Sequence, residues 1–81
     1  METRVAVMAI IVEKTEAAER LNACLHEYAD FIIGRMGLPY HKKGVNIVSI
    51  ALDAPQDVIS ALAGKLGNIK GVSVKTALSN V

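Results

Sequence analysis

The residues with the clearest chemical potential lie within the stretch 31–40 and just beyond it. Arg35 interrupts a run that is otherwise apolar, and two adjacent lysines, Lys42 and Lys43, follow shortly after it. The planar fork of Arg35 can clamp a carboxylate or a phosphate, and the lysines can add point charges. One hypothesis is therefore a small-anion site at a subunit interface, with Arg35, Tyr40, Lys42 and Lys43 as its candidate ligand-binding residues.

Arg35 also has an interpretation that needs no ligand. Residues 31–37 resemble an edge strand, and a charged side chain on an edge strand blocks pairing with other sheets. Pro39 is expected to stop the strand pairing just beyond Arg35, because proline cannot donate to a strand ladder. On the sequence alone this protective role is favoured over the anion site.

Few other residues are suited to chemistry. Cys24 lies in the apolar stripe of a predicted helix, where a small buried hydrophobe fits better than a nucleophile. His26, Asp30, His41 and Asp53 are the acid or base candidates that an enzyme would use, and each has a capping, loop or surface explanation. No HxxxH or CxxC spacing links such residues, so a metal site could form only across subunits. We therefore assign no catalytic residue, no metal site and no cofactor.

The composition indicates a protein that associates with itself. The chain has 81 residues, which we interpret as a single domain over 1–81, and so short a domain buries a smaller fraction of its surface than a large one. Hydrophobic residues make up 52% of it but aromatic residues only 4%, so the excess is aliphatic and predicts apolar surface buried between subunits. The net charge of +1 is too small for stand-alone nucleic-acid binding.

The apolar run at 5–12 does not predict a membrane segment. It is far too short to span a bilayer, and it ends in Glu13-Lys14 without the small residues of a signal-peptide cleavage site. The single cysteine excludes an internal disulfide and is typical of a reducing compartment. A cytoplasmic protein with no membrane contact is the expected result.

Hydrophobic periodicity and capping residues predict six elements. Thr15 is the expected N-cap of the first helix, which should end near Ala29-Asp30, and Asp53 is the expected N-cap of the second, which should end at Leu66 before a left-handed Gly67-Asn68. The four expected strands cover 5–12, 31–37, 45–52 and 72–78, with a hairpin loop at 38–44.

This order of elements predicts the fold class. Strands 5–12 and 45–52 are apolar on both faces and should be central, whereas 72–78 alternates like a half-exposed edge strand. Right-handed crossovers place both helices on one face of the sheet. The result is an α+β fold, a ferredoxin-like βαββαβ sandwich with an antiparallel sheet of order 4-1-3-2. Its second face stays apolar, and another copy of the chain is the expected cover. The expected oligomer is a dimer or a tetramer, joined through this face or through the edge strands 31–37 and 72–78.

Three segments, taken together, carry a family resemblance that covers essentially the whole chain. They are His26-Glu-Tyr-Ala-Asp-Phe-Ile-Ile-Gly-Arg-Met-Gly-Leu-Pro-Tyr40, Ile59-Ser-Ala-Leu-Ala-Gly-Lys-Leu-Gly67 and Gly71-Val-Ser-Val-Lys-Thr76. In this combination the chain resembles the ACT-like family of iron-only hydrogenase system regulators.

The resemblance implies a non-enzymatic regulatory module. Such a module would bind a small effector, or a partner protein of the iron-only hydrogenase system, at its subunit interfaces. Two other functions remain open, a small dimeric ferredoxin-like enzyme of unknown reaction and an assembly factor without a ligand.

Overall fold

The chain folds into four strands and two helices in the predicted order. The computed structural model describes residues 2–81. Two short 3-10 turns, Ala29–Phe31 and His41–Lys43, stand on either side of the second strand. The elements are β1 (Arg4–Val12), α1 (Ala17–Glu27), β2 (Ile32–Tyr40), β3 (Val45–Ala54), α2 (Gln56–Gly67) and β4 (Val72–Leu78).

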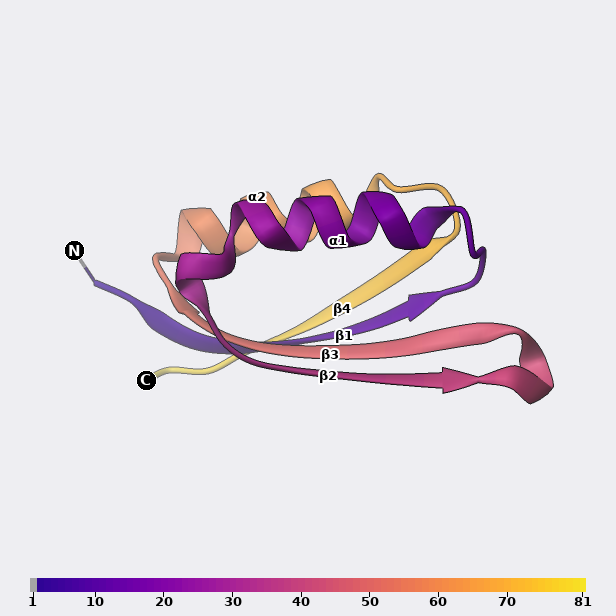
Figure 1. Cartoon of the computed structure of the whole chain (residues 1–81). Coiled ribbons are helices and arrows are strands. Elements are labelled where there is room, and N and C mark those ends of the chain that lie inside the picture. Colours follow the sequence, from indigo (N-terminus) through magenta and orange to yellow (C-terminus); the bar gives the residue numbers. More distant parts are fainter. Residues whose placement is uncertain (1) are drawn as a thin grey trace.

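The sheet has the order β2-β3-β1-β4, with all neighbours antiparallel. This is the predicted order 4-1-3-2 counted from the other edge, and both helices lie side by side on one face of the sheet (Figure 1). The prediction of a ferredoxin-like sandwich is therefore confirmed. The molecule is elongated, about 41 by 18 by 17 Å, and its β2–β3 hairpin projects beyond the helices (Figure 1).

The core forms because one set of alternate residues on the two central strands packs against the apolar stripes of both helices. Alternate residues of β1 and β3 are buried, and α1 and α2 each present residues at helical spacing to them. The largest side chains with almost no exposed surface are Met8, Ile10, Val12, Leu21, Ile50, Leu52, Leu62 and Leu66.

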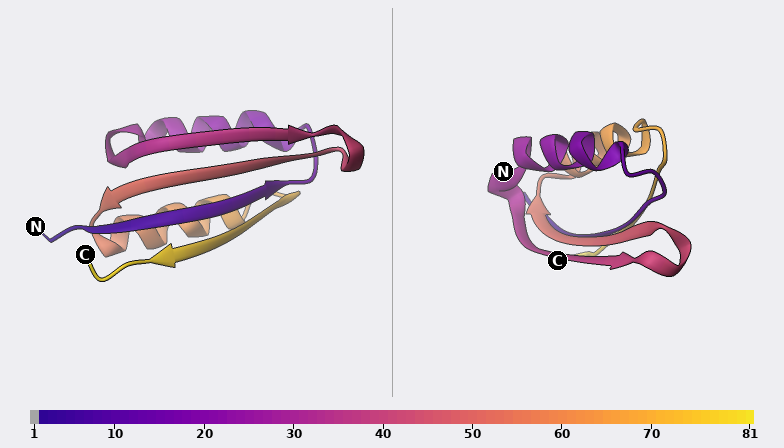
Figure 2. Two further views of the ribbon diagram at one scale, coloured as in Figure 1. Left: turned by 90° about the horizontal axis from the view of Figure 1, so that it is seen from below. Right: turned by 45° about the vertical axis from the view of Figure 1, so that its right-hand side comes forward.

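The other alternate residues of the strands form a second sheet face that no element of residues 2–81 covers. The left view of Figure 2 looks onto this face, with the helices behind the sheet. We call this surface the open face. It is largely apolar, and Met36 and Leu38 are 61% and 55% exposed. Strand register places on it Val7, Ala9 and Ile11 from β1, Met36, Leu38 and Tyr40 from β2, Ile47, Ser49 and Ala51 from β3, and Lys75 from β4.

The prediction that β2 ends before Pro39 is wrong. The strand continues to Tyr40, and Pro39 is paired in register with Asn46. An edge strand tolerates proline where its nitrogen faces away from the neighbouring strand, because no ladder hydrogen bond is then lost. The connection to β3 is therefore shorter than the predicted loop at 38–44, and Gly44 closes it with a left-handed φ of 65°.

Both predicted helix caps are also wrong. Asp53 belongs to β3, where it pairs with Val5, and the N-cap of α2 is Pro55. The N-cap of α1 is Glu16 instead of Thr15, and neither cap makes a side-chain hydrogen bond. The backbone compensates, since the amides of Ala17 and Val58 donate to carbonyls three residues earlier.

The left-handed end predicted for α2 is absent from the described chain. Gly67 is the last residue of the helix, and Asn68 keeps a right-handed conformation with its amide donating to the Gly64 carbonyl at 3.1 Å. The left-handed residue comes later, at Gly71, where φ is 87°. Neither helix within residues 2–81 has both the length and the apolar content needed to cross a membrane.

Candidate functional site

Arg35 lies on the helix face of the edge strand β2. Its register partner is Ile50, whose side chain is buried beneath the helices. The Arg35 Nη2 donates a hydrogen bond to Oδ1 of Asn22 in α1, at 2.6 Å. The guanidinium therefore bridges the edge of the sheet and the neighbouring helix, and it makes no ion pair with a carboxylate of residues 2–81.

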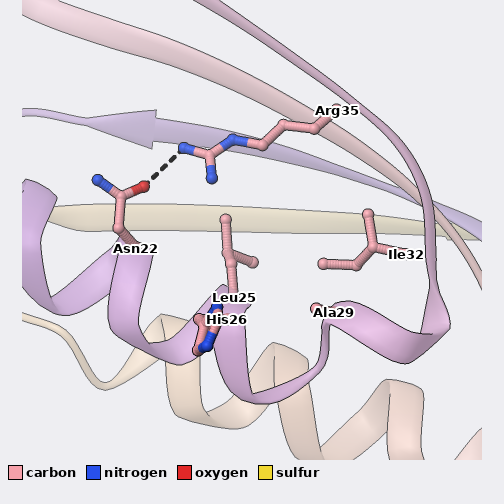
Figure 3. Close-up of a pocket in the computed structure, with 6 residues that line it drawn as sticks. All are labelled: Asn22, Leu25, His26, Ala29, Ile32 and Arg35. Carbon is pink, nitrogen blue, oxygen red and sulfur yellow. Dashed lines mark hydrogen bonds between the residues drawn. The ribbon is translucent and has the colours of Figure 1, made fainter.

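A cavity of about 280 Å³ opens between α1 and the start of β2. Figure 3 shows Leu25 pointing towards the Arg35 guanidinium, with Asn22 and His26 on successive turns of the helix. One side of the cavity is polar and the other apolar, a combination suited to a small carboxylate with a short aliphatic part. The lining residues are Asn22, Leu25, His26, Ala29, Ile32 and Arg35.

The other three candidate residues lie at the far end of β2. Tyr40 is on the open face beside Val45, and Lys42 and Lys43 are in the 3-10 turn at the hairpin tip. Arg35 and Tyr40 are five residues apart, so their side chains point to opposite faces and their backbones are separated by roughly 17 Å. Within one protomer the structure thus separates Arg35 from Tyr40, Lys42 and Lys43. A shared anion site for all four stays a prediction for a subunit interface.

Asn22 was not predicted as a site residue from the sequence. The signal that could have found it is the spacing of Asn22 and His26, four residues apart on α1, which places both beside Leu25 on one side of the helix. Their approach to Arg35 depends on where the chain returns after α1, and local spacing does not determine that path.

The acid and base candidates are distributed along the chain. His26 lines the Arg35 cavity, Asp30 is in the 3-10 turn after α1, Asp53 is near the end of β3, and His41 is at the hairpin tip. In the part of the chain that the structure describes, no three His, Cys, Asp or Glu side chains gather in a metal-binding arrangement.

Cys24 faces the core, as its place in the apolar stripe predicts. It is only 8% exposed, and burial, assisted by the nearby Glu27 carboxylate, raises the pKa of its thiol. Because the thiolate is the reactive form, we expect the native protein to react with a disulfide reagent such as DTNB at least tenfold more slowly than the denatured chain. Equal rates in buffer and in guanidinium chloride would contradict this burial.

Comparison with known proteins identifies the family. Residues 4–76 match the sequence model of a family described as "TM1266-like: Iron-only hydrogenase system regulator, putative". The chain is similar to the uncharacterized protein TM1266 from Thermotoga maritima, with 36% identity and a TM-score of 0.92 over 95% of this chain and 98% of that one. No curated protein matches it.

Two further solved structures share the fold alone. A formyltetrahydrofolate deformylase from Pseudomonas putida KT2440 has a TM-score of 0.69 at 10% identity, over 95% of this chain and 29% of that one. The de novo designed protein Foldit4 has a TM-score of 0.63 at 16% identity, over 99% of both chains. By the extent of the family match and the identity with TM1266, the chain belongs to the TM1266-like family of iron-only hydrogenase system regulators.

Proposed function

We propose that the protein is an oligomeric regulatory module of the iron-only hydrogenase system, which binds a small effector or a partner protein at its subunit interfaces. The family match supports the regulatory role. The observation that carries the proposal furthest is the open face, where Val7, Ile11, Met36, Leu38 and Tyr40 are all at least 36% exposed.

The extent of the open face favours a second copy of the chain as its cover. Four strands spaced about 4.8 Å apart, each about 30 Å long, span roughly 600 Å². Monomeric soluble proteins rarely expose contiguous apolar patches larger than a few hundred Å². Two open faces related by a two-fold axis would bury each other, as a symmetric dimer requires. Sedimentation velocity of the unmodified protein tests this, and a stable monomer at micromolar concentration would rule it out.

The Arg35 cavity, at the β2 edge of the sheet, is the proposed effector site, and a subunit joined through this edge strand would enclose it. A carboxylate there would take the N–H groups of Arg35 that Asn22 leaves free, and the wall of Leu25, Ala29 and Ile32 would take its aliphatic part. A ligand that binds only the folded state stabilises it by about 2.7 kcal/mol at one hundred times Kd. We therefore expect some of the carboxylates from acetate to glutarate to raise the melting temperature, less so at high salt.

Substitution separates the effector role of Arg35 from its protective role. Arg35→Ala should abolish the thermal shift, and Lys42→Ala, at the hairpin tip, should weaken it only if a partner subunit contributes its lysines. If Arg35 only protects an edge strand, no carboxylate or phosphate will shift the melting temperature, and Arg35→Ala will aggregate or change in oligomer size. If no carboxylate or phosphate shifts the melting temperature and Arg35→Ala keeps the oligomer size of the unmodified protein, both roles are excluded.

The regulatory role itself is tested in a host that has an iron-only hydrogenase. Deletion of the gene should change hydrogenase activity or transcript level, and the unmodified protein should restore it. Complementation by Arg35→Ala or by a monomeric variant should fail. Unchanged hydrogenase after deletion would contradict the proposal.

A further inference from the structure

A second cavity of about 290 Å³ shares no lining residue with the Arg35 cavity and lies at the end of the molecule where β1 leads into α1 and α2 leads into β4. Figure 1 shows these two connections side by side at the same end of the sandwich. Strand register agrees, since Val12, the last residue of β1, pairs with Val72, the first of β4. The cavity is lined by Lys14, Glu16, Ala17, Arg20, Ile69 and Lys70.

Three cations from three separate segments line this cavity. Lys14 comes from the β1–α1 connection, Arg20 from the first turns of α1 and Lys70 from the α2–β4 connection. The ion pair between Lys65 and Glu27 is the one found within residues 2–81, so no carboxylate there lies within 4 Å of these three cations. With Glu16 counted, the lining carries a local charge of +2, from three cations minus one carboxylate. Glu13 and Glu19, next to Lys14 and Arg20 in the sequence, do not line the cavity, so the excess of positive charge belongs to the lining itself.

The side chain of Lys14 lies against Gly71 in the α2–β4 connection. A Cβ atom on Gly71 would lie 2.9 Å from the Lys14 Cγ and 3.1 Å from its Cβ, so glycine leaves room for the aliphatic stem of Lys14. The left-handed φ of 87° at Gly71 also favours glycine. The Glu13 amide donates to the Gly71 carbonyl at 2.7 Å, which joins the two connections.

The N-terminal end of α1 borders the cavity. Ala17, the first residue of the helix, lines the cavity, and the N-terminal end of a helix carries partial positive charge. A tetrahedral dianion with several acceptor oxygens can use three cationic donors arriving from different directions. Ile69 and Ala17 supply a small apolar border.

We propose that this cavity binds the phosphate group of a small phosphorylated ligand, through Lys14, Arg20 and Lys70. The site is separate from the Arg35 cavity and goes beyond the proposed effector and oligomer functions. Its ligand class is a phosphate monoester or a diphosphate, because the cations surround a space of limited volume instead of forming a stripe that follows a nucleic-acid backbone.

The experiment is a titration of the ¹⁵N-labelled protein with inorganic phosphate, followed by amide chemical shifts at constant ionic strength. We expect saturable shifts at the amides of residues 14–17 and 70–71. Lys14→Gln, Arg20→Gln and Lys70→Gln should each raise the Kd about threefold or more, because each removes one charge from the site. Lys65→Gln, which removes the same charge from an exposed lysine that pairs with Glu27 and does not line the cavity, should leave the Kd unchanged.

Glu16→Gln gives a test that misfolding cannot imitate, because the expected result is a gain in phosphate affinity and misfolding would cause a loss. It removes the one carboxylate of the lining, so phosphate affinity should rise about twofold or more. The proposal is overturned if the shifts grow linearly without saturation, if chloride reproduces them at equal concentration, or if Glu16→Gln and the three cation variants match the unmodified protein. Neither the sedimentation result nor the carboxylate panel bears on these outcomes, so this inference and the proposed function can fail independently.

Discussion

Leu38→Asp is expected to convert the protein from an oligomer into a monomer at micromolar concentration. Leu38 lies on the open face of β2, paired with Ile47 of β3, and more than half of its side chain is exposed in the single protomer. In an oligomer covered at this face, the introduced carboxylate would be buried without a partner, which costs about 3–5 kcal/mol. Dissociation should therefore become about a hundredfold to a few thousandfold more favourable, as sedimentation equilibrium will measure.

A matched substitution controls for the added charge. Ala61→Asp places the same carboxylate on an exposed position of α2, on the far side of the molecule from the open face. This variant should keep the oligomer size of the unmodified protein, and both variants should keep the far-ultraviolet circular dichroism of the fold. If Leu38→Asp sediments like Ala61→Asp, the open face is not the subunit interface.

The topology was predictable because it depends on patterns that are redundant along the chain. Apolar residues on both faces of 5–12 and 45–52 are typical of central strands, and both segments are central in the sheet. The same pattern does not show which set of alternate residues faces the helices. Ile10 and Ile11 are equivalent in the sequence, yet Ile10 is fully buried under the helices while Ile11 is 36% exposed on the open face.

Local signals failed where pairing with a neighbouring strand of the sheet competed with them. Asp53 and Pro55 look like a helix start, but Asp53 pairs with Val5, forty-eight residues earlier, and this pairing extends β3 to Ala54. Pro39 looks like a strand end, but its pairing with Asn46 continues because β2 lies at the sheet edge. In both places tertiary pairing outweighed the local preference.

The candidate sites were only partly predictable for a related reason. Arg35 stands out as a charge in an apolar run, but its partner Asn22 is an ordinary polar residue of a helix surface. Lys14, Arg20 and Lys70 are unremarkable charges in three segments. Crossover geometry brings them to one end of the sandwich, and this requires the full topology.

Ile10→Ala should lower the stability of the fold by about 2–5 kcal/mol, through lost burial and the cavity left in the core. Ile10 is fully buried between Val48 and Val74, its register partners on β3 and β4. Domains of this size are stable by only about 5–15 kcal/mol, so the melting temperature should fall by ten degrees or more. Thermal unfolding followed by circular dichroism measures this.

Ile11→Ala is the matched control, because the same side chain is shortened one residue along the strand, on the open face. If the open face is a subunit interface, this variant should lose stability in a way that depends on protein concentration, since unfolding is then linked to dissociation. The loss caused by Ile10→Ala should be present at every concentration. A concentration-independent loss of equal size for both variants would mean that Ile11 belongs to the protomer's own core, and the open face would then have no partner to bind.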